Sequence, residues 1–260
     1  MRAALSGLGL WKATGAAWTP ALPTSDGGVL PHTWHYAGSG ALFQDSGLTT
    51  PATADGDPIG GSTNQGSDSH SLIQATAGNK PTLKLNILNG EAVYRCDGGD
   101  WLRGAYNAAL SHPLTVIIVL AMDAGSVNDD NPHKAFDSDD NTNILRLTTD
   151  ATQNPDTWLV TGGTSRNLNA TDGDWTIWTW VCNNTAHAVY ENGGANILPN
   201  GTGTPNPDGL TLAAGFNDSN PFTGDIAELL VYASDLSTAD KNQLGNYAAI
   251  KYALSWTVIT

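Results

Sequence analysis

Short runs of β-branched and aromatic residues, separated by turn residues, dominate the chain from Pro81 onward. Such runs are typical of strands in an all-β protein. We expect strands at Leu83–Leu88, Ala92–Cys96, Leu114–Ala121, Asn143–Thr148, Thr157–Thr161, Trp175–Cys182, Ala186–Glu191, Leu210–Ala214 and Phe222–Tyr232. Because side chains alternate along a strand, Trp178 and Trp180 should share one face and Trp175 should point to the other.

One helix is predicted near the C-terminus. Ser237 is a good N-cap, and Asp240 three residues later makes a near capping box. Helix-forming residues continue to about Leu254. An apolar face is expected from Leu244, Tyr247, Ala248 and Tyr252. Many strands with a single late helix predict an all-β fold, a sandwich or jelly roll with one short C-terminal helix.

Residues 1–36 follow a different pattern, with prolines, small residues and three tryptophans (Trp11, Trp18 and Trp34) but no periodicity. We interpret them as an extended N-terminal anchoring arm and residues 37–260 as one sandwich that folds without it. Residues 37–80 are expected to form loops with short strands. The chain shows no internal repeat.

Composition narrows the range of functions. The formal net charge is -14 at pH 7, and no cluster of basic residues is present. Nucleic-acid binding is therefore not expected, nor is attraction to an anionic membrane. The longest apolar run, Leu114–Met122, is too short to span a bilayer. The N-terminal apolar run is broken by Gly7, Gly9 and Lys12, so a cleaved signal peptide is not expected.

Two cysteines, Cys96 and Cys182, both fall in apolar strand patterns. This favours buried free thiols, although a bridge across a sheet stays open.

Three segments carry a resemblance to a known family. They are LFQDSGLTTPATADGDPIG at 42–60, QATAGNKPTLKLNILNGEAVYRCDGGDWL at 74–102 and NPFTGDIAELLVYASDLSTADKNQLGNYAAIKYAL at 220–254. Together they resemble the concanavalin A-like, laminin-G-like modules over roughly residues 40–254. The first segment looks most like the versions encoded by phages. The resemblance implies the antiparallel two-sheet form of the jelly roll, and such modules occur in virion proteins and as carbohydrate-binding appendages of hydrolases.

Catalytic chemistry is not expected. Hydrolases of the concanavalin A-like class carry carboxylates at alternating positions of one strand, and this sequence has no such run. Asp225 and Glu228 are the nearest pair, but their odd spacing predicts opposite faces. His32 and His35 lie in a segment without a helix to align them. We therefore predict a protein that is not an enzyme, with no catalytic, cofactor or metal residues.

Two further sequence features could indicate ligand binding, one for calcium and one for sugars. The segment 123–143 is rich in aspartate, and 137–143 offers oxygen ligands at alternating positions, which would suit calcium. It lacks the glycine and distal glutamate of an EF-hand, so a solvated acidic loop is favoured. Exposed tryptophans could stack on sugar rings, although they also fill sandwich cores. The candidates are Trp101, Trp158, Trp175, Trp178 and Trp180.

The leading hypothesis is a non-enzymatic phage virion protein, either a capsid decoration or a tail-associated adhesin, located in the virion. Its expected partners are other capsid or tail proteins, further copies of itself in a homo-oligomer, and a host-surface glycan. The alternative is a secreted carbohydrate-binding module of a polysaccharide-degrading system. The sequence leaves open the oligomeric state, the glycan and whether 123–143 binds calcium.

Overall fold

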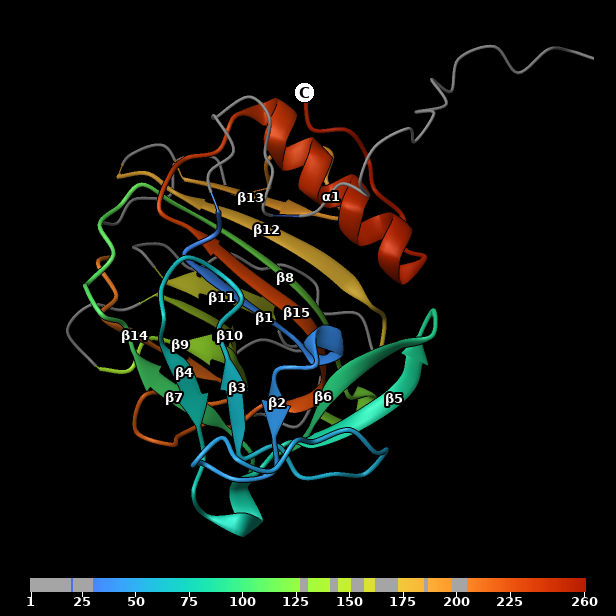
Figure 1. The fold of residues 1–260 in the computed structure, drawn as a ribbon. Coiled ribbons are helices and arrows are strands. Elements are labelled where there is room, and N and C mark those ends of the chain that lie inside the picture. Colours follow the sequence, from blue (N-terminus) through green and yellow to red (C-terminus); the bar gives the residue numbers. More distant parts are fainter. Residues whose placement is uncertain are drawn as a thin grey trace, which may run out of the picture.

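The computed structural model describes Pro20 and residues 30–126, 131–140, 145–150, 157–161, 173–184, 187–197 and 205–260. Within these parts the chain forms two antiparallel sheets packed face to face and one α-helix (Figure 1). The predicted all-β jelly-roll sandwich with a C-terminal helix is confirmed. Three short 3₁₀ helices lie at Ala37–Ser39, Ala77–Asn79 and Ala124–Ser126.

The first sheet has the order β13-β12-β8-β15-β6-β5, with β1 paired to β15. Its strands are β1 (Thr33–Tyr36), β5 (Thr82–Leu88), β6 (Glu91–Asp97), β8 (Leu114–Met122), β12 (Thr176–Cys182), β13 (Ala188–Glu191) and β15 (Thr223–Tyr232). Nine of nine residues of β8 are buried, because this central strand packs against the second sheet on one side and the helix on the other.

The second sheet has the order β11-β10-β9-β14-β7-β4-β3-β2. Its strands are β2 (Leu42–Phe43), β3 (Gly61–Thr63), β4 (Ser71–Ile73), β7 (Leu102–Ala105), β9 (Lys134–Asp137), β10 (Arg146–Asp150), β11 (Thr157–Thr161) and β14 (Gly209–Leu212). Asn143–Thr148 was expected to be a strand. The observed β10 begins at Arg146, and residues 141–144 lie outside the described part.

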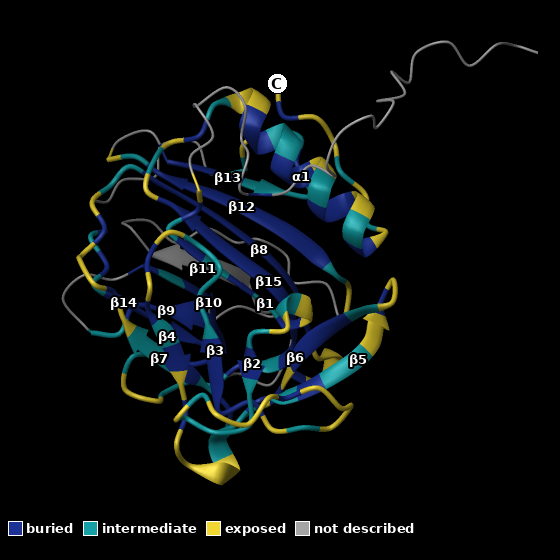
Figure 2. Cartoon of the chain, in the orientation of Figure 1, coloured by how far each residue is buried: buried dark blue, intermediate teal, exposed yellow. Residues whose placement is uncertain are grey.

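The core has two layers, both visible as dark blue in Figure 2. The larger one lies between the sheets and contains Trp178, Trp180 and both cysteines, which are free and buried. The smaller one lies between the first sheet and the helix. The predicted alternation of β12 is confirmed, because Ile177 packs in the second layer and its even-numbered neighbours pack in the first.

Helix α1 (Thr238–Tyr252) covers the outer face of the first sheet (Figure 1). Ser237 is its N-cap and accepts a hydrogen bond from the Asp240 backbone N–H at 3.1 Å. Leu244, Ala248 and Tyr252 are buried against the sheet, as the apolar pattern predicts. No helix in the described residues is long and apolar enough to cross a membrane.

The boundary predicted between arm and sandwich at residue 36 is wrong by one strand. Thr33–Tyr36 is β1, and it pairs antiparallel with β15 over its whole length. His35 points into the space between the sheets, and the Trp34 indole N–H donates to Glu228 at 2.6 Å. The strand was missed because it is short and its partner lies nearly 200 residues away in sequence. Residues 1–19 and 21–29 lie outside the described part.

Asp225 and Glu228 do not point to opposite faces as predicted. A β-bulge between Ile226 and Glu228 shifts the register against β8, so side-chain alternation restarts there. Both carboxylates therefore lie on the outer face of the first sheet. Asp225 makes an ion pair with Arg95, while Glu228 is fully buried and accepts hydrogen bonds from α1.

Part of the predicted solvated acidic loop at 123–143 is a strand instead. Lys134–Asp137 is β9, and Asp137 is fully buried. The carboxylate tolerates burial because the Arg146 Nε and the Lys134 Nζ lie 3.2 and 3.5 Å from it. Residues 127–130 and 141–143 of this segment lie outside the described part.

Candidate binding face on the second sheet

Side-chain alternation places polar residues on the outer side of the second sheet. In β14, Leu210 and Leu212 point into the core, so Thr211 points outward. Its register partners are Arg103 on β7 and Asp137 on β9, which therefore share its face. We call this surface the polar face. It consists of Trp101, Arg103, Lys134, Asp137, Arg146, Thr211 and the turn 215–219.

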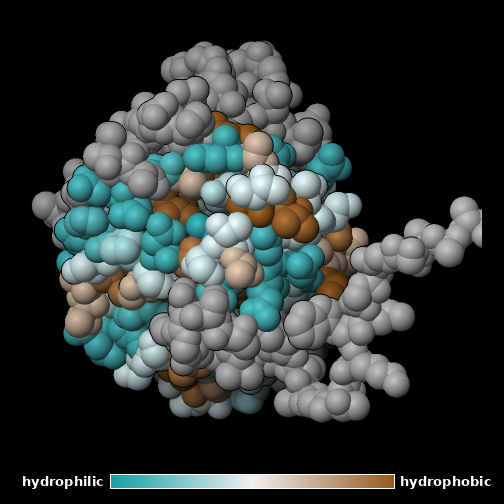
Figure 3. All heavy atoms as spheres, turned by 90° about the horizontal axis from the view of Figure 1, so that it is seen from above, coloured by the Kyte–Doolittle hydropathy of each residue, from teal (hydrophilic) through white to brown (hydrophobic). Residues whose placement is uncertain are grey.

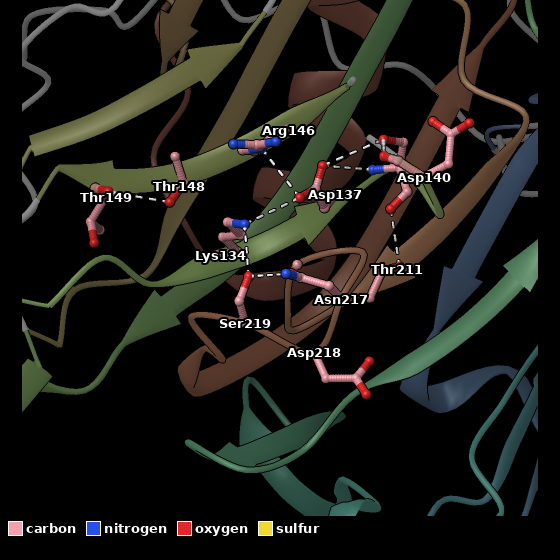
Figure 4. Close-up of polar contacts among 12 residues, drawn as sticks. Lys134, Asp137, Asp140, Arg146, Thr148, Thr149, Thr211, Asn217, Asp218 and Ser219 are labelled. Atoms are coloured by element: carbon pink, nitrogen blue, oxygen red, sulfur yellow. Dashed lines mark hydrogen bonds and ion pairs between the residues drawn. The ribbon is translucent and has the colours of Figure 1, made fainter. Parts of the chain in front are cut away.

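One half of the polar face is a buried ionic cluster centred on Asp137 (Figure 4). Besides its two cationic neighbours, Asp137 accepts the Ser138 backbone N–H at 2.9 Å. Lys134 Nζ donates to Ser219 Oγ at 3.2 Å, which ties β9 to the turn 215–219. Burial lowers the pKa of Lys134, and the nearby Arg146 guanidinium lowers it further. This half is therefore rigid and largely closed to solvent.

The other half is open and is organised by Arg103. Its Nε donates to Thr211 Oγ1 at 2.8 Å, and its Nη2 donates to the Gly215 carbonyl at 3.0 Å and to Asp218 Oδ1 at 2.7 Å. The guanidinium carbon lies 4.6 Å from the centre of the Trp101 ring. These contacts hold the Arg103 side chain in one position before any ligand arrives.

The side chains of the open half are more exposed to solvent than those of the ionic cluster around Asp137. The Arg103 side chain is 25% exposed and that of Asp218 is 51% exposed. Ile73, the register partner of Arg103 on β4, is 42% exposed and adds an apolar side chain beside the guanidinium. An arginine, a carboxylate, an indole ring and an aliphatic side chain therefore meet on one accessible surface.

The electrostatics of the polar face differ from those of the whole chain. Three cations (Arg103, Lys134 and Arg146) face two carboxylates there, and Asp137 is shared between two of them. Elsewhere in the described residues Arg95, Lys84, Lys241 and Lys251 each pair with one carboxylate. In a chain of net charge -14, three of the eleven basic residues therefore gather on this face.

A pair of carboxyl groups borders the polar face. Asp139 follows β9 and Asp208 precedes β14. Burial and the neighbouring Asp208 carboxyl group together raise the pKa of Asp139 to about 6. Asp139 is therefore largely protonated in mildly acidic solution. In the described part of the chain no group of three or more potential ligands is placed to hold a metal ion.

The structure divides the candidate tryptophans. Trp178 and Trp180 are 3% exposed core residues, so neither forms a sugar platform. Trp175 is partly buried against the helix-side core layer, and the side chain of Trp158 lies outside the described part. Trp101 is the candidate that stands on the polar face. Arg103 and Asp218 were missed, because their meeting depends on the pairing of β7 with β14, which joins segments more than a hundred residues apart.

Comparisons with known proteins bear on the fold. No protein-family model and no curated protein matches the sequence. Among solved structures, the chain is similar to a GH54 α-L-arabinofuranosidase soaked with a cyclic sulfate inhibitor, with a TM-score of 0.62 and 14% identity over 90% of this chain and 66% of that one. The chain is also similar to an arabinofuranosidase complexed with arabinofuranosyl-α-1,2-xylobiose, with a TM-score of 0.61 and 13% identity over 94% of this chain and 67% of that one.

The receptor-binding domain of botulinum neurotoxin D is also similar, with a TM-score of 0.52 and 12% identity over 73% of this chain. The chain spans about half the length of that domain, covering 50% of it. At such low identity these similarities establish a shared β-sandwich fold and nothing about ligands. The fold class is one used both by binding domains and by a glycosidase.

Proposed function

We propose that this chain is a non-enzymatic carbohydrate-binding module of a phage virion, which binds glycans through the open half of the polar face. The observation that carries the proposal is the fixed arrangement of Arg103, Asp218 and Trp101. Sugar recognition needs adjacent hydrogen-bond donors and acceptors for hydroxyl groups and an apolar surface for the ring. This surface offers all three, held in place by contacts within the protein.

The similar solved structures support the carbohydrate part of the proposal. They include a receptor-binding domain and an arabinofuranosidase in complex with an oligosaccharide. The virion part is supported by the resemblance of residues 42–60 to phage-encoded modules. The glycosidase similarities also favour the second candidate, a secreted carbohydrate-binding module. Labelling of phage particles with an antibody to this chain separates the two.

The absence of catalysis is part of the proposal. Asp225 and Glu228 share a face, but each is bound by its own cation, and Glu228 is inaccessible. We expect purified protein to release no sugar from any polysaccharide that it binds.

A glycan array followed by calorimetry tests the binding site. Arg103→Ala and Asp218→Asn should each weaken binding at least about tenfold. The first removes the guanidinium donors, and the second replaces a charged acceptor, which also fixes Arg103, with a neutral amide; a charge-assisted hydrogen bond is worth about 1.5 kcal/mol or more. Lys84→Ala and Asp55→Asn are matched controls. That ion pair has side-chain exposures of 25% and 52%, against 25% and 51% for Arg103 and Asp218, but belongs to the first sheet and its neighbouring loop. Equal affinity for all four variants would contradict the site.

A further inference from the structure

Three histidines from two distant segments meet at one end of the sandwich. His32 and His35 flank the start of β1, and His70 directly precedes β4. The Nε2 atoms of His35 and His70 are 3.2 Å apart. Asp68 lies beside them, with its carboxylate oxygens 3.0 Å from His32 Nε2 and 3.5 Å from His70 Nδ1. The sequence did not indicate this cluster, because His70 lies in a polar stretch without strand periodicity.

His35 is surrounded by neutral groups. It is 1% exposed, and its Nδ1 lies 2.8 Å from Ser62 Oγ, which in turn lies 3.0 Å from the Tyr94 hydroxyl. Its register partner on β15 is the apolar Leu229. Burial lowers the pKa of His35 well below its ordinary value, and the charge of His70 lowers it further. No carboxylate contacts this imidazole among the described residues.

His70 has a partial counter-charge. Its ring faces Asp68, His32 and the ring of Tyr106. Burial lowers the pKa of His70 to about 4, although Asp68 opposes the shift. The Asp68 carboxylate also accepts hydrogen bonds from Asn107, from its backbone N–H at 3.1 Å and from its side-chain amide at 2.7 Å. One shared carboxylate therefore cannot compensate three imidazolium ions.

We infer that this cluster is an acid-sensitive latch that holds β1 on the sandwich. The hydrogen bond between His35 and His70 needs one N–H donor and one free lone pair. When both rings are protonated, the acceptor is lost and two positive charges stand about 3 Å apart in a buried site. The second protonation therefore expels one ring, and His35 can leave because it belongs to a peripheral strand.

The topology allows β1 to separate from the rest of its sheet. In the described residues β15 is the only strand that pairs with β1, and the other edge of β1 is held by the loop 64–68, whose Gln65 and Asp68 backbone N–H groups donate to the Trp34 and His32 carbonyls at 2.9 and 3.2 Å. Pro20, which precedes β1 in the sequence, is also bound to the sandwich, since the Tyr232 hydroxyl donates to its carbonyl at 2.9 Å. Without β1, β15 keeps β6 and β8 as its partners. Opening of the latch would therefore release β1 while the rest of the first sheet stays paired.

The charged groups on the opposite side of β1 are Glu228, which binds Trp34, Lys251, whose Nζ lies 4.2 Å from the centre of the Tyr36 ring, and Glu91. Burial and the two glutamates raise the pKa of Tyr36.

The sign and size of the effect follow from linkage. Both imidazoles have a lower pKa in the closed state than the value of about 6.5 in the open state. The closed state is therefore fully favoured above pH 6.5, and its advantage falls as the pH drops toward 4. At pH 5 each imidazole should shift the equilibrium toward opening by about 30-fold.

Hydrogen exchange measured by mass spectrometry tests the latch on the full chain. Amide protection of β1, corrected for intrinsic exchange, should fall at least about 30-fold between pH 7.5 and pH 5. Protection of β8 should change much less. In His35→Gln/His70→Gln the pH dependence of β1 should disappear. His112→Gln, which replaces a histidine bound to Asn206 outside the cluster, should retain it.

Three outcomes would overturn the inference. Protection of β1 that does not depend on pH excludes a latch, and a parallel loss in β8 indicates global unfolding instead. If the double variant does not fold, the pKa values of His35 and His70 can be measured by NMR titration of the unmodified protein, which tests the latch directly. Folded-state pKa values near 6.5 for His35 and His70 would remove the linkage on which the latch depends.

Discussion

Lys251 joins the helix to the first sheet through one buried ammonium group. Its Nζ lies 3.0 Å from Glu228 Oε2 and 4.2 Å from the centre of the Tyr36 ring, and Tyr252 also donates to Glu228 at 2.8 Å. Glu228 is one of the few glutamates of the chain and is fully buried. A buried carboxylate of this kind depends on its cation, because the charge cannot be solvated.

We expect Lys251→Met to destabilise the protein by about 3 kcal/mol or more, since it leaves the buried Glu228 charge without a cation. Urea unfolding at pH 7 measures the change. Lys241→Met on the same helix is the control. Its partner Asp235 is 34% exposed, so that loss should cost less than about 1 kcal/mol. Similar losses for both variants would show that the Glu228 network adds nothing specific.

The residues of the two sites were only partly predictable. Trp101 could be named from its chemistry, because an exposed indole is a common sugar platform. The face of the sheet on which Glu228 lies could not be predicted from sequence. The β-bulge that restarts side-chain alternation before Glu228 depends on the packing of β15 against β8. Arg103 and Asp218 could not be paired for a related reason, since no local pattern records which strands become neighbours.

At the scale of elements, long strands were predicted well and short ones were missed. β8 and β15 carry nine and ten residues with dense apolar patterns, which identify a buried strand from sequence. β2, β3 and β4 have only two or three residues each, too few for a periodic pattern, so their pairing depends on neighbours and not on propensity. β9 was hidden within an aspartate-rich segment, because the burial of its Asp137 depends partly on Arg146 of β10.

The position of β1 changes the expectation for truncated chains. A protein starting at Leu30 keeps β1 and should unfold near the full-length midpoint. A protein starting at Ala37 loses the strand, the His35 contacts and the Trp34–Glu228 hydrogen bond. We expect it to be less stable by at least about 3 kcal/mol, the sum of several buried hydrogen bonds and one large side chain. Thermal melting of both chains checks this. Equal melting temperatures would show that the sandwich does not need β1, as the prediction of an arm over residues 1–36 requires.

Close approach of β4 and β7 depends on Gly104. A Cβ at this position would overlap the backbone oxygen of Ser71, and a backbone atom cannot move aside easily. We expect Gly104→Ala to cost about 1–3 kcal/mol and to weaken glycan binding, because it displaces the neighbouring Arg103. Gly78→Ala is the control, since nothing lies within 4 Å of a Cβ there. Chemical denaturation and glycan titration would show whether the two effects occur together.

At the scale of the whole molecule, most of the surface disfavours association. In the view from the α1 side, hydrophobic residues are scattered among hydrophilic ones (Figure 3). The large apolar side chains exposed in the described residues lie on separate segments, such as Ile73 on β4, Ile87 on β5 and Ile250 on α1. With a net charge of -14, contacts between copies would be opposed by repulsion unless a specific surface or partner offsets it. The expected homo-oligomer therefore stays a prediction.

Two groups of titrating residues give the molecule opposing responses to pH. The histidine cluster favours the folded state more strongly as pH rises toward 6.5. The raised pKa of Asp139, about 6, has the reverse effect, because its folded form holds a proton that the unfolded form releases near pH 4. The Asp139 contribution is therefore present below about pH 4 and is lost as pH rises through 6.

Asp139→Asn isolates the second response. The amide should remove the repulsion between Asp139 and Asp208 without changing the shape of the side chain, so the variant should be more stable than the parent at pH 7.5. The gain should stay within about 1 kcal/mol, because the carboxyl group is partly exposed and solvent screens its charge. At about pH 3.5 Asp139 is protonated in the folded parent and mostly protonated in the unfolded parent, so the two proteins should unfold at nearly the same urea concentration. Asp57→Asn, which alters an exposed carboxylate bound to backbone N–H groups in the loop 53–57, controls for the loss of one negative charge from an acidic chain. A gain at both pH values would assign the effect to net charge, and a loss at pH 7.5 would show that Asp208 needs an ionised Asp139 beside it.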